Sequence, residues 1–343
     1  MIELKDDTLR FSFPEVHPRA SLTVAFERTL RIPDDERTYD LPPGLGCFPL
    51  RHVDDAGARV PATWREHGGV MLPMYQAEAM WLCFQGAGTS ERLSEYPFAI
   101  RVAAGKIDAV TGKSWEPGLT RRPQNYMVCP GQPWLDGYVV AKGLIRQFVA
   151  MPLGAGYTAE EQLSGRPEHG GLQLQVYPMK REVFERRFPE GPMETGPIHR
   201  VVLSKEGPRG HVASEMVLGL APGGRMKQQI FADTFDLADW DLSHSSRCFV
   251  HLANSLVWRA ITGEAPPTVP PTAAEYTRAG LPWFEYYDDS CTPVPGSEEL
   301  ARLLSVMEMG ARKGEVPLPE NEAVAPERVV VYRAGNRVRE GAF

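Results

Sequence analysis

Four residues with metal-binding side chains lie close together in the chain: Asp241, His244, Cys248 and His251. Carboxylate, imidazole and thiolate are the groups that hold zinc in proteins. On a helix, His244 and Cys248 would share a face, with His251 one turn further on. On a strand the same side chains would separate, leaving an acidic surface turn followed by a core segment. The sequence leaves both interpretations open. We therefore predict no cofactor, with a divalent metal at these residues as the alternative.

Two other segments carry aromatic side chains of the kind that dominates recognition sites. One is 132–137, whose Leu-Asp-Gly end is typical of a turn, and the other is 283–287. The stretch 168–171, between two predicted strands, is a third candidate. Each of these side chains could also belong to the core. If one region binds a ligand or a partner, we expect it to use Gln132, Trp134, Asp136, His169, Trp283, Phe284 and Tyr286.

The sequence contains no complete catalytic signature. The segment 105–114 has six residues between its glycines, whereas a phosphate-binding loop needs four. The GxSxG and HExxH patterns do not occur, nor does GxGxxG after a strand. A site assembled from distant residues would escape such a search. Acid–base or metal-assisted hydrolysis by Asp136, His169, Asp241 or His244 is therefore one alternative to a binding protein.

The elements that must position these residues are mainly strands. Within 20–32, the apolar residues Leu22, Val24 and Phe26 alternate with polar ones, which is the period of a half-buried strand. Arg28 falls on the apolar side. It either reaches solvent or a structural carboxylate at a strand end or bulge, or points inward to grip an anion. Further strands are predicted at 77–85, 98–103, 106–110, 138–141, 144–151 and 171–177, with an edge strand at 328–332.

Helices are predicted to be few and short. Thr158 with Glu161, and Thr272 with Glu275, form the capping box that starts a helix. Helices are also predicted at 179–188 and 298–309. A doubly wound fold would require helices at regular intervals between the strands, and the sequence does not predict them. We therefore predict an α+β fold that is predominantly antiparallel β, sandwich- or barrel-like, with long loops rich in proline and glycine.

Proline and glycine also suggest the organisation of the chain. We predict a β-rich domain at 1–188 and a second β/α region at 199–310, joined by a possible linker at 189–198. Residues 264–289 form a proline-rich and aromatic arm within the second region. Residues 311–343 are expected to be a weakly held tail.

Composition narrows the class of protein. The net charge is −7, which gives no basic footprint for nucleic acid or for an anionic membrane. The five cysteines are odd in number and widely spaced, as expected for reduced thiols. The start resembles no secretory signal, and no apolar run reaches membrane-spanning length. These features predict a cytoplasmic protein without a nucleic-acid or membrane partner.

Four sequence segments, taken together, resemble a family of hypothetical bacterial and fungal proteins. They are the segments 132–137, 146–154, 170–173 and 280–284. The resemblance extends over about residues 20 to 290. It implies no activity, fold or catalytic residue that could be carried over to this chain.

The leading hypothesis is a non-catalytic protein that binds a partner or assembles with itself. We expect a homo-oligomer in which the arm at 264–289 packs on a neighbouring copy, because loops of this length often reach across to another surface. A small-molecule carrier is the third hypothesis, beside the binding protein and the assembled enzyme site. A carrier would contain a large apolar cavity with few titratable groups.

Overall fold

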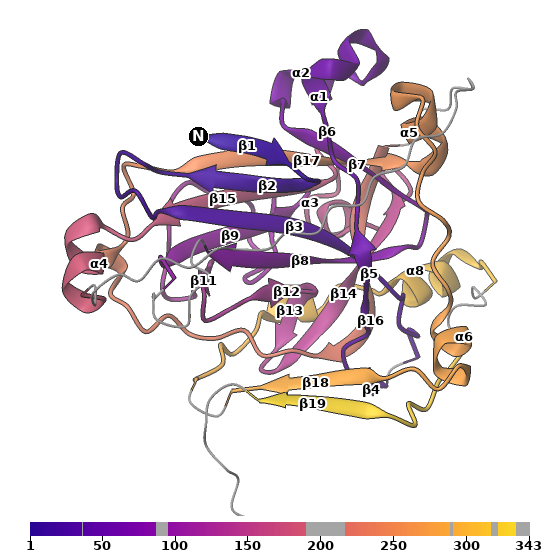
Figure 1. Ribbon diagram of the computed structural model, residues 1–343. Helices are drawn as coiled ribbons and strands as arrows, with labels where there is room; N and C mark the ends of the chain where they lie inside the picture. The colour runs from indigo at the N-terminus through magenta and orange to yellow at the C-terminus, as the bar shows by residue number, and fades with distance from the viewer. Residues whose placement is uncertain (36, 87–94, 190–216, 289–290, 317–321, 334–343) are drawn as a thin grey trace, which may run out of the picture.

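The computed structural model describes residues 1–35, 37–86, 95–189, 217–288, 291–316 and 322–333. Its main feature is one large, mainly antiparallel sheet with short helices at its margins (Figure 1). A smaller sheet of two strands lies beside it. The predicted α+β class, dominated by antiparallel strands, is therefore confirmed.

The large sheet is built on nine principal strands. In order of pairing they are β1 (Ile2–Lys5), β2 (Thr8–Ser12), β3 (Ser21–Thr29), β8 (Ala79–Gly86), β14 (Leu144–Pro152), β16 (Val217–Lys227), β17 (Ser246–Asn254), β15 (Leu172–Pro178) and β9 (Phe98–Ala104). Shorter strands join their sides: β4 (Thr38–Tyr39), β5 (Gly44–Cys47), β6 (Arg51–His52), β7 (Val70–Met74), β10 (Ile107–Asp108), β11 (Met127–Cys129), β12 (Trp134–Leu135) and β13 (Gly137–Ala141). Parallel pairing joins β4 to β16 and β7 to β17.

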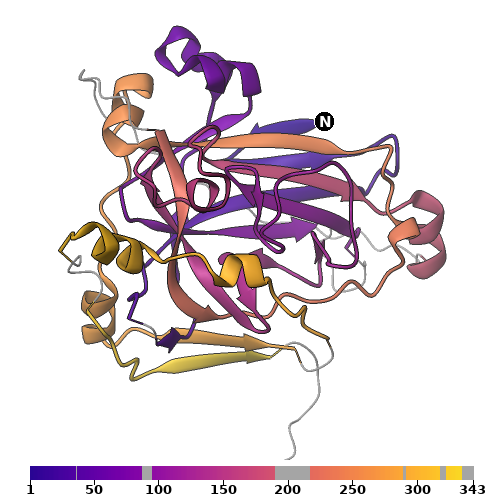
Figure 2. The ribbon, with the colours of Figure 1, turned by 180° about the vertical axis from the view of Figure 1, so that it is seen from behind.

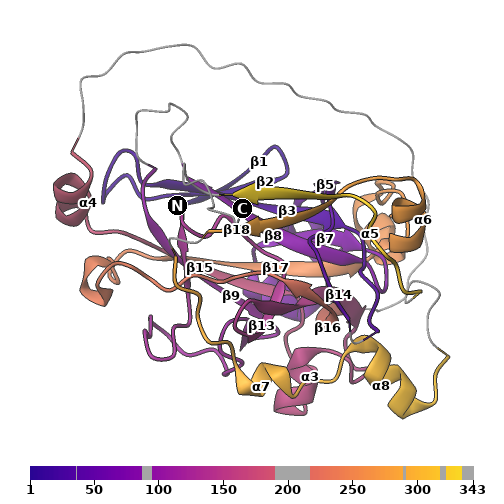
Figure 3. The ribbon, with the colours of Figure 1, turned by 90° about the horizontal axis from the view of Figure 1, so that it is seen from below.

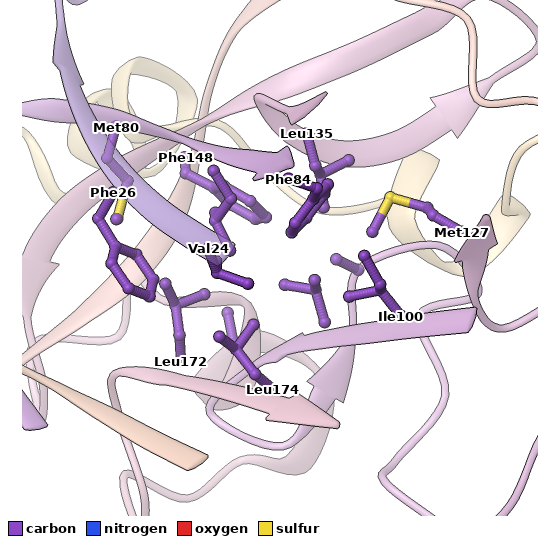
Figure 4. Packing of buried hydrophobic residues seen from close by; sticks show 14 of the residues in the cluster. Val24, Phe26, Met80, Phe84, Ile100, Met127, Leu135, Phe148, Leu172 and Leu174 are labelled. Atoms are coloured by element: carbon purple, nitrogen blue, oxygen red, sulfur yellow. The ribbon is translucent and has the colours of Figure 1, made fainter. Parts of the chain in front are cut away.

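The core lies between two parts of this sheet. Alternation along β3 buries Leu22, Val24 and Phe26 completely, as the period of two predicts. Figure 4 shows side chains of β3 and β8 pointing toward those of β9 and β15, among them Val24, Phe26, Phe84, Ile100, Leu172 and Leu174. The sheet therefore bends over on itself around a shared apolar core, whose burial stabilises the fold.

Eight short α-helices flank the sheet within the described residues: α1 (Val53–Ala56), α2 (Ala62–His67), α3 (Ala159–Ser164), α4 (Arg181–Arg187), α5 (Ser255–Thr262), α6 (Ala273–Arg278), α7 (Glu298–Ala301) and α8 (Val306–Lys313). Of these, α3, α7 and α8 lie side by side along one side of the sheet, as Figure 3 shows; this is the side that faces the viewer in Figure 2. The capping boxes predicted for Thr158 and Thr272 are confirmed at the starts of α3 and α6.

The predicted helix at 298–309 is in fact two helices. Ser297 caps α7 by accepting a hydrogen bond from the Leu300 N–H. The chain leaves the helix after α7, and Ser305 then starts α8 with a capping box of its own, formed with Glu308. Leu300 and Leu303 are buried, but the Ser-x-x-Glu signal at Ser305 starts a new helix and so divides the predicted one.

The strand predicted at 106–110 is also shorter than expected. Lys106 has a φ of +58° and lies with Gly105 in the two-residue turn between β9 and β10. Beyond β10, the Asp108 carboxylate accepts hydrogen bonds from the Val110 and Thr111 N–H groups, which turns the chain out of the strand.

Arg28 reaches a structural carboxylate, one of the outcomes left open by the sequence. Its guanidinium lies 2.7 Å from Glu78, and both side chains are buried. The pairing of β3 with β5 shifts register between Glu27 and Thr29, which is the bulge expected at this point. Arg28 also donates to the carbonyl of Thr268 in the arm, at 2.5 Å. The ion pair therefore helps to hold the arm on the sheet.

The predicted linker at 189–198 lies outside the described residues, apart from its first position. Strands from 1–188 and from 199–310 pair with one another, for example β14 with β16 and β15 with β17. One sheet therefore contains strands of both predicted regions.

The arm packs against other parts of the same chain. After α6, its strand β18 (Trp283–Tyr287) pairs in parallel with β19 (Val329–Arg333), forming the small sheet at the bottom of Figure 1. The Tyr75 hydroxyl donates to the Pro267 carbonyl at 2.9 Å, which fixes the start of the arm. The strand predicted at 328–332 thus forms, shifted by one residue, and belongs to the part of the chain expected to be a tail.

Candidate functional site

A hollow of about 460 Å³ lies between the large sheet and the arm. This volume is in the range of roughly 300–1,000 Å³ that small-molecule sites occupy. Aromatic and proline side chains make up most of its walls, and we call it the aromatic cavity. It is lined by Leu41, Pro42, Pro43, Gly44, Trp81, Trp134, Asp136, Phe284, Tyr286 and Tyr332.

The strands β8 and β12 supply the two tryptophans of the cavity. Along β8, Met80 and Leu82 are buried in the core, so the alternation of the strand directs Trp81 to the opposite face. Trp134 on β12 pairs with Cys83, two residues further along β8. The pairing of these strands therefore brings Trp81 and Trp134 to the same side of the sheet.

The arm supplies the aromatic side chains that face them. Phe284 and Tyr286 are two residues apart on β18, so they share a face of that strand. Trp283 takes the other face, is fully buried, and donates its indole N–H to the Thr277 hydroxyl at 3.1 Å. Trp283 thus anchors the arm, while Phe284 and Tyr286 line the cavity.

The segment 41–44 closes the cavity between the sheet and the arm. Leu41 and Phe284 exchange two backbone hydrogen bonds, of 2.8 and 2.9 Å. A Cβ atom at position 44 would lie 3.4 Å from the Trp81 ring. Because Gly44 has no side chain, this part of the cavity stays open. Ring contacts complete the walls: Trp134 meets Tyr286 edge-on at 4.8 Å, and Phe284 stacks near Tyr332 at 5.9 Å.

Asp136 is the one carboxyl group that lines the aromatic cavity, and it is only 4% exposed. Its Oδ2 accepts a hydrogen bond of 2.7 Å from the Gln228 amide, while its own N–H donates to the Gln228 Oε1 at 3.1 Å. No lysine or arginine among the described residues forms an ion pair with it. Burial raises the pKa of the carboxyl from 3.8 to about 7, with Gln228 and Trp134 offsetting part of the effect.

Gln132 shapes the loop under the cavity without lining it. It is buried, its amide donates to the Trp134 carbonyl at 3.0 Å, and its Oε1 accepts from the Phe231 N–H at 3.1 Å. Of the seven residues predicted to bind, the structure therefore brings four to one cavity: Trp134, Asp136, Phe284 and Tyr286. Gln132 and Trp283 support that cavity from behind.

His169, the seventh, lies elsewhere. Its loop is fixed by the Glu160 carboxylate, which accepts backbone hydrogen bonds from Glu168, His169 and Gly170 at 2.8–3.1 Å. The His169 ring lies 6.1 Å from that of His67. His169 therefore belongs to a second region of the molecule.

That region contains a hollow of about 430 Å³, which we call the basic hollow after Lys106 and Arg247. The ring of His67 stacks on Phe249 at 4.2 Å in its wall, and His251 lies 6.3 Å behind it. Desolvation lowers the pKa of His67, and lowers that of His251 to about 4. The lining residues are Glu66, His67, Gly69, Lys106, Trp115, Gln173, Leu174, Arg247, Cys248 and Phe249.

The four residues predicted as metal ligands are not gathered into one site. The strand β17 begins at Ser246, so Cys248 and His251 project from opposite faces of it. The His251 Nε2 donates a hydrogen bond of 3.0 Å to the Gly68 carbonyl, and the ring stacks on Trp64. Within the described ranges, no three His, Cys, Asp or Glu side chains are arranged to hold a metal. The strand interpretation of this segment is the one the structure shows.

Asp241 and His244 form a local turn instead. The His244 Nδ1 lies 2.8 Å from an Asp241 oxygen and 3.2 Å from the Ser243 hydroxyl. In a catalytic triad the serine and the aspartate meet different ring nitrogens. Here both meet Nδ1, so the arrangement stabilises the turn and does not activate the serine.

Comparison with known proteins gives no identity. No family model, curated protein or solved structure matches the chain. In the part of the chain that the structure describes, no helix is both long and apolar enough to cross a membrane.

Sequence reasoning missed several walls of the aromatic cavity, among them Trp81, the segment 41–44 and Tyr332. Trp81 carried a usable signal, because it is a large aromatic residue out of phase with the core-facing Met80 and Leu82. The segment 41–44 carried none, since its place opposite β18 depends on a pairing between positions more than 240 residues apart.

Proposed function

We propose that the protein reversibly binds a small, largely apolar molecule in the aromatic cavity. The observation that carries this proposal is a cavity walled by Trp81, Trp134, Phe284 and Tyr286 around a single buried carboxyl group, Asp136. Small-molecule sites are typically concave and apolar, with few polar groups that fix the orientation of the ligand. This is the arrangement that a carrier needs.

A neutral fluorescent probe, N-phenyl-1-naphthylamine, tests the proposal directly. It should bind the wild-type chain saturably at one site, and its emission should rise as it leaves water. Energy transfer that decreases in Trp81→Phe and Trp134→Phe would place the probe in the cavity, since these two of the seven tryptophans line it. Saturation, not a linear increase, distinguishes a site from adsorption.

Two variants make the test specific. Gly44→Leu directs a side chain into the space beside Trp81, so it should lower the affinity at least about tenfold, equivalent to ~1.4 kcal/mol. Leu256→Ala removes a side chain that is 71% exposed on α5 and lies outside the cavity, so it should leave binding unchanged. Equal binding by wild type and Gly44→Leu would refute the aromatic cavity as the site.

Self-assembly through the arm remains a prediction. The support for it is the strand β19, which lies outside the arm but pairs with β18 of the arm, and on which Val331 is 45% exposed and Tyr332 56% exposed. Within the described residues, β19 pairs with β18 alone, and an open strand edge can accept another strand. Light scattering over a hundredfold range of protein concentration would show a dimer that dissociates on Val331→Lys. A monomer throughout that range would refute it.

The cytoplasm remains our proposed location, since all five cysteines are free thiols. Burial raises the pKa of Cys129 and Cys248 to about 12, so both are protonated and unreactive at neutral pH. We propose a small molecule as the main partner, and neither nucleic acid nor membrane.

A further inference from the structure

Two features of the aromatic cavity present negative electrostatic potential to a ligand. The faces of aromatic rings carry negative potential, which attracts a cation positioned over them. Asp136 adds a carboxyl group that has no basic partner among the described residues. A buried carboxylate without a positive partner is costly, and a positively charged ligand would remove that cost.

We propose that the ligand of the aromatic cavity carries a methylated ammonium group, held over the rings of Trp81, Trp134 and Tyr286 with Asp136 as its counter-ion. This inference rests on the proposed function, because it names the chemical class of the molecule bound there. The rings supply cation–π attraction and the carboxylate supplies the opposite charge.

The polar groups of the cavity favour a methylated ammonium over a primary amine. A primary ammonium has three N–H donors, each of which must find an acceptor when it is buried. The lining side chains that can accept are the Asp136 carboxyl and the hydroxyls of Tyr286 and Tyr332, whereas tryptophan N–H only donates, so a primary ammonium would have to reach all three acceptors at once. A quaternary ammonium has no N–H to satisfy and fits the remaining apolar walls.

The surroundings of Asp136 reinforce this preference. The Glu27 carboxylate on β3 lies close to Gly44 in the cavity wall: a Cβ atom at position 44 would be 3.6 Å from its Oε2. Cys83 on β8 interacts electrostatically with Asp136, and its pKa is raised to about 11, mainly by burial, so it stays neutral below that pH. Tyr286 on β18 also has a raised pKa, with desolvation as the main cause. Of these three side chains, Glu27 is the one that carries a charge, and its charge is negative.

Ionisation of Asp136 should couple to binding. A cation binds the ionised carboxylate better than the protonated acid, so its affinity should rise as pH increases through about 7. A neutral ligand should show no such increase. The two classes of ligand can thus be separated by the sign of their pH dependence.

Calorimetric titration of the full chain with choline and with 3,3-dimethylbutan-1-ol tests the inference, because the second replaces the charged nitrogen by carbon at nearly the same shape. At pH 8, choline should bind at least about tenfold more tightly. A peptide containing trimethyllysine is titrated in parallel, since the same headgroup occurs on free molecules and on modified proteins. Binding of either cation above the neutral compound supports the inference, and the tighter of the two identifies the source.

Two variants that each remove one negative charge complete the experiment. Asp136→Asn keeps an acceptor for Gln228 and should lower choline affinity by about tenfold or more, with little effect on the neutral compound. Glu66→Gln, in the basic hollow, should leave both affinities unchanged. The ligand-stabilised unfolding temperature gives a second readout and verifies that both variants fold.

The possible failures are distinguishable. If choline, the peptide and the neutral compound bind equally, or Asp136→Asn leaves the cation preference intact, the ammonium inference is wrong while the binding function stands. If none of them binds and N-phenyl-1-naphthylamine does not bind either, the proposed function itself is wrong.

Discussion

The aromatic cavity and the basic hollow are similar in volume, about 460 and 430 Å³, but opposite in charge. The cavity surrounds a buried acid with aromatic rings and provides no base. The hollow places Lys106 and Arg247 at a partly open surface, above histidines whose pKa values are lowered. In the first region the unpaired charge is buried, whereas in the second it can be hydrated. This difference makes the aromatic cavity the better candidate for ligand binding, because a buried charge without a partner is the costlier one.

The largest expected effect concerns the anchor of the arm. Trp283→Ala should lower the free energy of unfolding by about 3–5 kcal/mol and abolish binding in the cavity, because a fully buried indole is lost and β18 with it. Trp115→Ala in the basic hollow should cost only about 1–2 kcal/mol, since that ring is half-buried. Urea denaturation of both variants measures the difference. Equal losses would show that the arm is not held by its tryptophan.

A second comparison concerns the response of Asp136 to pH. Its pKa is 3.8 in its ordinary state and about 7 when folded, so the folded chain binds the extra proton. Its contribution to stability is therefore complete below about pH 4 and is lost as pH rises to about 7. Asp136→Asn should remove this loss and be more stable than wild type at pH 8, by on the order of 4 kcal/mol. Denaturation between pH 4 and 8 checks the slope, and an unchanged slope in the variant would contradict the assignment.

His251, behind the basic hollow, should show the opposite slope. Desolvation lowers its pKa from 6.5 to about 4, so the unfolded chain binds the proton in that interval. Its contribution to stability is complete above about pH 6.5 and is lost as pH falls toward 4. His251→Gln keeps a donor for the Gly68 carbonyl and should flatten this loss, by on the order of 3 kcal/mol. If the variant lost stability more steeply than wild type as pH falls from 6.5 to 4, burial of His251 would not be the cause of the loss.

The smallest effect lies at the surface of the basic hollow. Lys106 is the second cause, after desolvation, of the lowered pKa of both His67 and His169. Lys106→Gln should therefore raise both pKa values while changing stability by less than about 0.5 kcal/mol. Histidine NMR titration measures this, with Asp136→Asn as the control that leaves both rings unaffected. If the pKa values of His67 and His169 did not change, Lys106 would not be a cause of their lowering.

Local patterns in the sequence predicted local structure well. The alternation of Leu22, Val24 and Phe26 identified β3, and the pairs Thr158–Glu161 and Thr272–Glu275 marked the starts of α3 and α6. These signals work because each depends on neighbours within one strand or one helical turn. The same reasoning failed at 298–309, where the Ser305 cap was overlooked.

The candidate site was only partly predictable for the same reason. Residue type alone predicts Trp134, Asp136, Phe284 and Tyr286 as candidates, yet nothing local indicates that Trp134 meets Tyr286, 152 positions further along the chain. Residues of ordinary type, such as Pro42 and Gly44, become walls through long-range pairing alone. The spacing of His244 and Cys248 suited a helix as well as a strand, so geometry had to decide.

The aromatic cavity draws its walls from five stretches of chain, of which β18 and β19 come after every strand of the large sheet in chain order. During synthesis, the sheet is therefore complete before the site exists. A ligand can bind only the finished molecule, so it stabilises that state alone by mass action: at a hundred times its dissociation constant, by about 2.7 kcal/mol. In a cell, ligand supply would set how much newly made chain survives quality control, and abundance of the protein would follow the abundance of what it carries.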